Sequence, residues 1–178
     1  MPNEPSFTSL PGLTLILGGA RSGKSREAER LVLASGLEPV YVATAEALDD
    51  EMAARIAEHR SRRSPPWRTI EEPLDLTPTL KRECAAGRAV LVDCLTLWLT
   101  NLMVAERPVE AELDRLLEAL PRLPGALVLV SNEVGQGVVP AGAMARAFVD
   151  HAGRLHQRIA EQADAVVFMT AGLARRLK

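Results

Sequence analysis

The sequence predicts an α/β fold, in which a mostly parallel sheet carries helices on both faces. Two observations predict it. Short apolar runs rich in Val, Leu and Ile alternate along the chain with longer segments of helical periodicity. Polar or glycine-rich residues follow these runs, as expected where parallel strands end. Parallel strands are buried on both faces, which explains why the runs are almost continuously apolar.

A single domain accounts for nearly the whole chain. The 178 residues fit one domain, and 47% hydrophobic with 25% charged residues is an ordinary globular balance. Residues 1–12 contain Pro2, Pro5 and the pair Pro11-Gly12, so we expect a mobile N-terminal tail there. Residues 13–178 are then expected to form the domain.

The strands and helices can be predicted from the spacing of apolar residues, from helix-capping residues, and from the glycines and prolines that interrupt regular structure. Strands are expected at 13–17, 39–43, 89–93, 126–131 and 165–170, with a short extended piece at 67–70. Helices are expected at 24–34, 49–59, 74–86, 95–105, 109–120 and 143–162. Asp49 or Asp50 can cap the second helix, Pro65-Pro66 stops it, and Gly87 marks the end of the third. Residues 132–142 are expected to form a long loop.

Composition excludes several classes of function. The net charge of −2 and an aromatic content of 3% oppose a nucleic-acid binder, which needs a basic field and stacking platforms. Cys84 and Cys94 form no CxxC pair, so we expect two reduced thiols in or near the core. No stretch is long and apolar enough to span a membrane, and no signal peptide is recognisable. A cytoplasmic protein is expected.

A complete G-x-x-x-x-G-K-[ST] motif lies between the first strand and the first helix. It comprises Gly18, Gly19, Ala20, Arg21, Ser22, Gly23, Lys24 and Ser25. In such a loop the glycines let backbone N–H groups wrap phosphate oxygens, and the helix that follows adds its positive end. Lys24 supplies charge to the β- and γ-phosphates, and the Ser25 hydroxyl can ligate Mg²⁺. The sequence therefore predicts a nucleotide triphosphate site.

Asp93 ends the third long apolar run, Val90-Leu91-Val92. A carboxylate at the end of a strand beside a phosphate loop can hold Mg²⁺, directly or through water. The alternative is that Asp93 caps the helix beginning near Leu95.

Positive charge gathers at the end of the second predicted helix, in His59, Arg60, Arg62 and Arg63. Such a cluster is a poor stability device, because solvated surface charges contribute only about 0–1 kcal/mol each. A polyphosphate ligand explains it better, although a solvated helix end remains the alternative. The neutral imidazole of His59 could also attack phosphorus. The Glu71-Glu72 pair could accept hydrogen bonds from a ribose or base, or form an acidic turn.

Taken together, several stretches resemble one family, the bifunctional adenosylcobinamide kinase / adenosylcobinamide-phosphate guanylyltransferase of cobalamin assembly. The stretches that carry the resemblance are Gly18–Arg26, Tyr41–Ala45, Leu48–Met52, Arg55-Ile56, His59-Arg60, Trp67–Glu71, Asp93–Thr96 and Asn132–Pro140. The phosphate loop is generic, whereas the blocks around Leu48–Arg60 and Asn132–Pro140 are specific. The similarity runs from about Leu13 to Lys178.

The resemblance implies a RecA-like P-loop catalytic domain with two activities and a trimeric assembly. The first reaction phosphorylates adenosylcobinamide with ATP or GTP, and the second transfers GMP from GTP to that phosphate and releases pyrophosphate. His59 matches the histidine that carries GMP, and Lys24 matches the catalytic lysine. Nucleotide contacts are implied for the phosphate loop and for Ala43, Thr44, Ala45, Arg60, Ser61, Arg62, Arg63, Glu71 and Asp93.

Three other functions share parts of this pattern. Another small-molecule P-loop kinase would use the phosphate loop and Asp93 but would need no covalent histidine. A regulatory GTP switch usually reads guanine through Asn-Lys-x-Asp, which does not occur here. An ATP-driven RecA-like motor would bind nucleic acid, which the charge and the scarcity of aromatics oppose.

Overall fold

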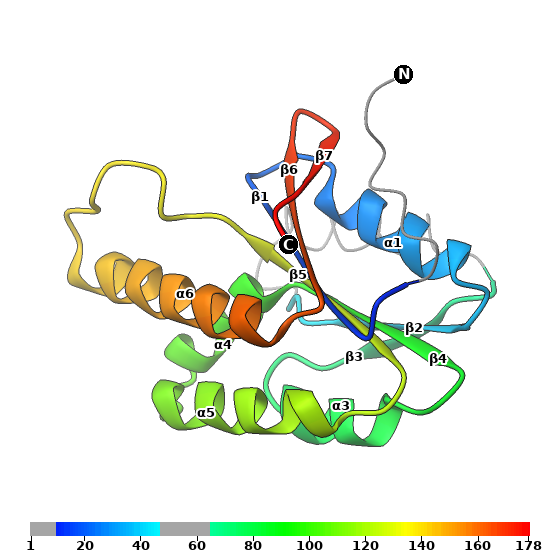
Figure 1. Cartoon of the computed structure of the whole chain (residues 1–178). Coiled ribbons are helices and arrows are strands. Elements are labelled where there is room, and N and C mark those ends of the chain that lie inside the picture. Colours follow the sequence, from blue (N-terminus) through cyan, green and yellow to red (C-terminus); the bar gives the residue numbers. More distant parts are fainter. Residues whose placement is uncertain (1–9, 47–64) are drawn as a thin grey trace.

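The computed structural model describes residues 10–46 and 65–178. Within these ranges one sheet of seven strands has the order β3-β2-β4-β5-β1-β6-β7 (Figure 1). The strands are β1 Leu13–Gly18, β2 Glu38–Ala43, β3 Arg68–Glu71, β4 Arg88–Asp93, β5 Ala126–Asn132, β6 Ala165–Thr170 and β7 Leu173–Arg176. All neighbouring pairs are parallel except β6 and β7. The predicted mostly parallel sheet is confirmed.

The sequence-based strands are confirmed, with one addition. The short extended piece at 67–70 is the edge strand β3, which pairs with β2. The antiparallel strand β7 was not expected. Its sequence, LARR, is short and has no buried residue, because the strand lies at the edge of the sheet. It is held by a tight hairpin in which Ala171 and Gly172 both have positive φ.

The helices described are α1 Lys24–Ala34, α3 Leu76–Glu83, α4 Leu95–Val104, α5 Val109–Ala119 and α6 Ala143–Gln162, with a 3-10 turn, η1, at Leu120–Arg122. The helix expected at 49–59, and residues 1–9 of the expected tail, lie outside the described residues. Leu10 lies within them and packs, partly buried, against the core. No helix in the described ranges is long and apolar enough to cross a membrane.

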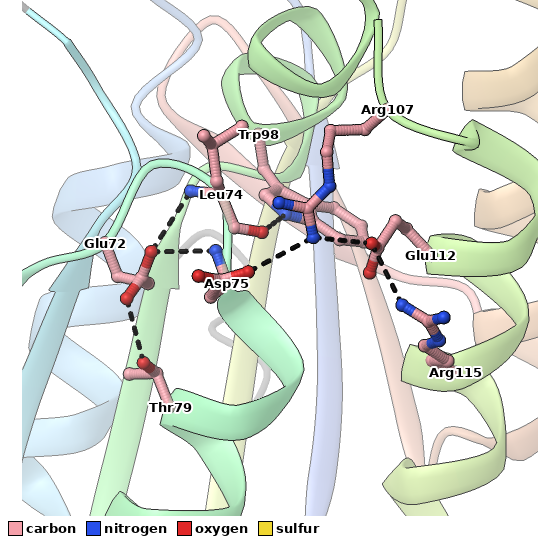
Figure 2. Close-up of polar contacts among 8 residues, drawn as sticks. All are labelled: Glu72, Leu74, Asp75, Thr79, Trp98, Arg107, Glu112 and Arg115. Carbon is pink, nitrogen blue, oxygen red and sulfur yellow. Dashed lines mark hydrogen bonds and ion pairs between the residues drawn. The ribbon is translucent and has the colours of Figure 1, made fainter. Parts of the chain in front are cut away.

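Helix α3 is shorter than the 74–86 helix expected from the sequence. The Glu72 carboxylate accepts hydrogen bonds from the backbone N–H groups of Leu74 (3.1 Å) and Asp75 (2.7 Å), so these residues form the turn before the helix (Figure 2). At the other end Cys84 is extended, which stops the helix at Glu83. Side-chain hydrogen bonding that precedes a helix competes with helical pairing, and the sequence period does not reveal it.

Helices cover both faces of the sheet, as expected. Helix α1 lies on one face, and α3, α4, α5 and α6 lie on the other (Figure 1). The sheet contributes alternate residues to two apolar clusters, so that Leu15 faces one cluster and Ile16 the other. The larger cluster contains the fully buried Trp98, whose indole N–H donates to the carbonyl of Leu74 at 2.8 Å. This packing holds the carboxyl ends of the parallel strands at one edge of the sheet.

Gly125 makes the turn before β5 possible, and its replacement tests this packing. Its φ is +84°, and a Cβ built on it would lie 2.3 Å from the carbonyl oxygen of Ala85. We expect Gly125→Ala to lower the free energy of unfolding by at least about 2 kcal/mol, since both backbone strain and a clash oppose it.

Gly153, inside α6 with open space at its Cβ position, is the matched control. Gly153→Ala should raise the free energy of unfolding by about 0.5–1 kcal/mol through helix propensity. Chemical denaturation measures both values. Equal stability of the two variants would contradict the packing described.

Candidate active site

The carboxyl edge of the sheet gathers most of the residues predicted for the site. The phosphate loop, residues 18–25, joins β1 to α1. In the sheet register Ala43 of β2 is paired with Asp93 of β4 on one side and with Glu71 of β3 on the other. Ligands of open parallel sheets bind at this edge. The structure therefore brings Ala43, Glu71 and Asp93 side by side, while their contacts with nucleotide stay a prediction.

The phosphate loop is tightly packed at its start. A Cβ built on Gly18 would lie 2.5 Å from the Ser22 Oγ and 2.7 Å from the carbonyl oxygen of Met169, so only glycine fits there. Gly23 has φ +93°, a conformation that side chains other than glycine's rarely adopt. The turn at Gly172 supports the same loop, because its N–H donates to the Ser22 carbonyl at 3.0 Å. The loop is thus held on β6 and its hairpin.

Polar groups inside the loop suit an anionic ligand. The ammonium of Lys24 is largely buried and donates to the carbonyl of Gly19 at 3.1 Å, within its own loop. The buried hydroxyl of Ser22 has no hydrogen-bond partner among the described residues. An orphaned buried hydroxyl is costly unless a ligand or water completes it. Helix α1 begins at Lys24 and directs its positive end at the same place.

Asp93 lies at the end of β4, where its carboxylate Oδ2 accepts a hydrogen bond from the buried Tyr41 hydroxyl at 2.8 Å. This bond orients the carboxylate. The alternative role as a helix cap is not observed, because Cys94 is the N-cap residue of α4 and no side chain caps that terminus. Ser25, in the first turn of α1, and Asp93 offer the hard oxygen donors that Mg²⁺ prefers. The residues present therefore fit a nucleotide-bound magnesium ion.

Thr44 joins the ends of β2 and β4. Its hydroxyl donates to the carbonyl of Cys94 and accepts from the Cys94 N–H, both at 2.8 Å. Its carbonyl accepts from the Asn101 side chain at 2.8 Å. Thr44 is fully buried and its backbone N–H donates to the Asp93 carbonyl at 3.2 Å, so its hydroxyl and its backbone both serve the fold. Burial raises the pKa of the Cys94 thiol to about 11, which keeps it protonated and unreactive at neutral pH.

Glu71 and Glu72, adjacent in the sequence, have different surroundings in the structure. Glu71 ends β3 and is exposed at the site edge. Glu72 instead holds the start of α3, since its second carboxylate oxygen accepts from the Thr79 hydroxyl at 3.2 Å (Figure 2). Beyond it, Arg107 bridges Asp75 before α3 and the buried Glu112 of α5 (Figure 2). The Glu72 carboxylate is thus committed to the start of α3, and the ribose or base role of Glu71 stays a prediction.

The predicted basic cluster lies outside the described residues. His59, Arg60, Ser61, Arg62 and Arg63 belong to it, so their roles stay predictions.

A polar group at the end of β5 was given no role from the sequence. Asn132 pairs in register with Gly18, and its side chain donates to the Thr96 hydroxyl at 3.0 Å. The next residue, Glu133, donates its backbone N–H to the Gly18 carbonyl at 3.1 Å. Their position directly after a buried strand, within the family-specific stretch Asn132–Pro140, is the sequence feature that could have identified them. Both lie beside the first residue of the phosphate loop.

The fold and this edge define a P-loop nucleotide-binding protein with a RecA-like sheet. Solved structures with the same fold include the RadB recombinase, with a TM-score of 0.50 and 19% identity over 90% of this chain and 75% of that one. The flagellar accessory protein FlaH from Methanocaldococcus jannaschii has a TM-score of 0.53 and 16% identity over 95% and 80% of the two chains. At these identities the likeness establishes the fold alone.

Residues 14–177 match the family model described as cobinamide kinase / cobinamide phosphate guanyltransferase. The chain is 60% identical to a bifunctional adenosylcobalamin biosynthesis protein of Pseudomonas aeruginosa, over 92% of this chain and 96% of that protein. It is 40% identical to the Salmonella typhimurium protein of the same description, over 93% and 99% of the two chains. The chain belongs to this family of bifunctional kinases and guanyltransferases, and the resemblance seen in the sequence is confirmed.

Lys24 tests the nucleotide site directly. We expect Lys24→Ala to weaken binding of ATP and GTP by about 10- to 100-fold, because a charged hydrogen bond to phosphate is worth about 1.5–3 kcal/mol. Isothermal titration calorimetry measures the affinity. Lys81→Ala, an exposed lysine on α3, is the control and should bind as the wild type does. Unchanged affinity in a folded Lys24→Ala protein would contradict the assignment.

Proposed function

We propose that this chain phosphorylates the aminopropanol hydroxyl of adenosylcobinamide and then transfers GMP from GTP to that phosphate through His59. ATP or GTP donates the phosphoryl group in the first reaction, and pyrophosphate leaves in the second. The observation that carries the proposal is a complete phosphate loop, with its orphaned Ser22 hydroxyl and buried Lys24, in a chain of the cobinamide kinase / guanyltransferase family.

The kinase reaction follows from the geometry of the loop. The loop precedes the N-terminus of α1, which would direct its positive end at bound phosphates, and Lys24 would offset the charge on the β- and γ-phosphates. Ser25 and Asp93 would hold Mg²⁺, whose charge further stabilises the phosphate oxygens. Tyr41 keeps the Asp93 carboxylate in one orientation. These groups orient the nucleotide so that the acceptor hydroxyl meets the γ-phosphorus in line.

The guanylyl transfer uses the same triphosphate with a different phosphorus. A neutral His59 nitrogen attacks the α-phosphorus of GTP, the bond to the bridging oxygen breaks, and pyrophosphate takes the electron pair. A phosphate oxygen of adenosylcobinamide phosphate then displaces the imidazole and receives GMP. Arg60, Arg62 and Arg63 are suited to stabilise charge on the phosphoryl oxygens during both displacements. What supports this step is the sequence pattern and family membership.

The covalent step is tested with GTP labelled at the α-phosphate. We expect wild-type protein to retain label after denaturation, as an acid-labile and base-stable phosphoramidate, and His59→Ala to retain none. EDTA present during the incubation with GTP should prevent labelling of the wild-type protein, because the transfer step depends on magnesium bound with the nucleotide. His151→Ala is the matched control, because His151 lies on α6 in contact with Glu110.

Two results would contradict a covalent intermediate on His59. No label in a wild-type protein that still binds GTP would favour the alternative, a small-molecule P-loop kinase without a covalent intermediate. Equal label in His59→Ala would place the phosphoramidate on another residue.

We further propose a homotrimer, as the resemblance implies. The loop between β5 and α6 offers apolar surface for an interface, since Val138 is 95% and Val139 is 76% exposed in the single chain. Sedimentation equilibrium should give about three times the chain mass of 19.2 kDa. A mass of one chain at micromolar concentration would contradict the proposal. The cytoplasmic location expected from the sequence stays a prediction.

A further inference from the structure

We propose that Glu133 is the general base of the kinase reaction, taking the proton of the corrinoid hydroxyl as that oxygen attacks the γ-phosphorus. His156 and Ser131 are the positioning residues that hold its surroundings. The inference rests on the two activities proposed above, and it assigns a residue to one of them and not to the other.

The backbone of Glu133 adjoins the phosphate loop. It follows directly after β5, the strand that lies between the phosphate-loop strand β1 and the Asp93 strand β4. Its backbone N–H donates to the carbonyl of Gly18, the first residue of the phosphate loop. Its side chain is 21% exposed, so the carboxylate is neither buried in the core nor free in solvent. A base for a bound acceptor requires such a partly open place beside the phosphates.

Neighbouring groups hold the Glu133 carboxylate in place. One oxygen, Oε1, accepts the backbone N–H of Gly135 at 2.6 Å. The other, Oε2, lies 4.0 Å from Nδ1 of the buried His156. The opposite ring nitrogen of His156, Nε2, is 2.7 Å from the Ser131 hydroxyl. Oε2 is therefore the oxygen left to receive a proton.

The protonation state of His156 is consistent with its role as a positioning residue for Glu133. Burial lowers the pKa of His156, while the nearby Glu133 carboxylate opposes that shift. The imidazole is consequently neutral at neutral pH and forms no permanent ion pair with Glu133. When the Ser131 hydroxyl donates to Nε2, the ring proton is on Nδ1 and faces the carboxylate. At 4.0 Å the ring lies beside the Glu133 carboxylate without a hydrogen bond, so Oε2 remains accessible.

The two reactions differ in their need for a base. An alcohol is a weak nucleophile at neutral pH and must lose its proton during attack. In the kinase step the new oxygen–phosphorus bond forms, the bond from the γ-phosphorus to the β–γ bridging oxygen breaks, and the nucleoside diphosphate takes the electron pair. The hydroxyl proton passes to Oε2 of Glu133 and then to solvent. The acceptor of GMP is instead a phosphate monoester, whose second pKa is about 6, so it is already ionised.

The experiment measures the two reactions separately in the full-length protein. Adenosylcobinamide with ATP reports the kinase, and preformed adenosylcobinamide phosphate with GTP reports the guanylyl transfer. We expect Glu133→Gln to lower kinase kcat by about 10²–10⁴-fold, the usual contribution of a general base. Guanylyl transfer should stay within about threefold of wild type, since it needs no proton acceptor. The amide retains an oxygen for the Gly135 N–H, so the local turn is preserved.

Three further variants sharpen the result. Glu133→Asp keeps a carboxylate and should recover part of the kinase activity. His156→Gln should lower kinase kcat with little change in the KM for the corrinoid, because it disturbs the base and not the binding of substrate. Glu118→Gln, an exposed residue of α5, is the control and should retain both activities.

Defined outcomes would overturn the inference. If Glu133→Gln reduces both reactions equally, the residue only supports the fold of the site. If it reduces neither, Glu133 is not the base. Wild-type protein lacking one of the two reactions would count against the proposed function itself, and this is distinguishable because it does not depend on the variant.

Discussion

The close packing of β1 between β5 and β6 is the constraint on which the catalytic edge depends. At one end of β1 the N–H of Leu13 donates to the Asp164 carboxylate at 2.7 Å, and at the other Gly18 lies against Met169 of β6 with no room for a Cβ. The phosphate loop begins at that second point. Its shape is therefore set by the neighbouring strands as much as by its own glycines, and a shift of β6 would move the groups that bind phosphate.

At the carboxyl edge of the sheet, the groups proposed to bind phosphate are distinct from the buried hydroxyls that hold the strand ends in place. Lys24 and the N-terminus of α1 gather positive charge at the phosphate loop, where we propose that a nucleotide binds. Thr44 and Tyr41 use their hydroxyls to hold β2 and β4 in place and to orient Asp93. Rigid supports of this kind reduce the reorganisation needed when charge develops on a phosphoryl group.

Much of this fold follows from sequence because its signals are local. Each buried parallel strand is an almost unbroken apolar run, and the phosphate loop is a contiguous motif, so neither depends on distant residues. Strand β7 escaped prediction because it has no buried residue and forms only by pairing with β6. The start of α3 was misplaced because the Glu72 side chain competes with helical pairing, an interaction that the apolar period does not encode.

The candidate site could likewise be predicted from the sequence only where its residues lie in local sequence motifs. The phosphate loop and Asp93 could be proposed from the sequence because each directly follows an apolar strand, and the structure places both at the ends of those strands. The contact between Ser131 and His156 joins residues 25 positions apart in the sequence. It forms only when α6 packs on the sheet, so no local sequence pattern predicts it. Thr44 was expected to touch nucleotide, yet its hydroxyl is committed to Cys94. Tertiary hydrogen bonds decide which of several polar residues at an edge remain available.

The place of β1 in the sheet also has a consequence for how the molecule is made. Its neighbours β5 and β6 both come much later in the chain, and the bond from Leu13 to Asp164 spans 151 positions. A ribosome delivers β1 before β5 and β6, so the backbone groups along both edges of β1 lack these partners while most of the chain is translated. Topologies with such high contact order fold slowly and expose aggregation-prone surface. The nucleotide pocket is consequently among the last parts of the protein to take shape.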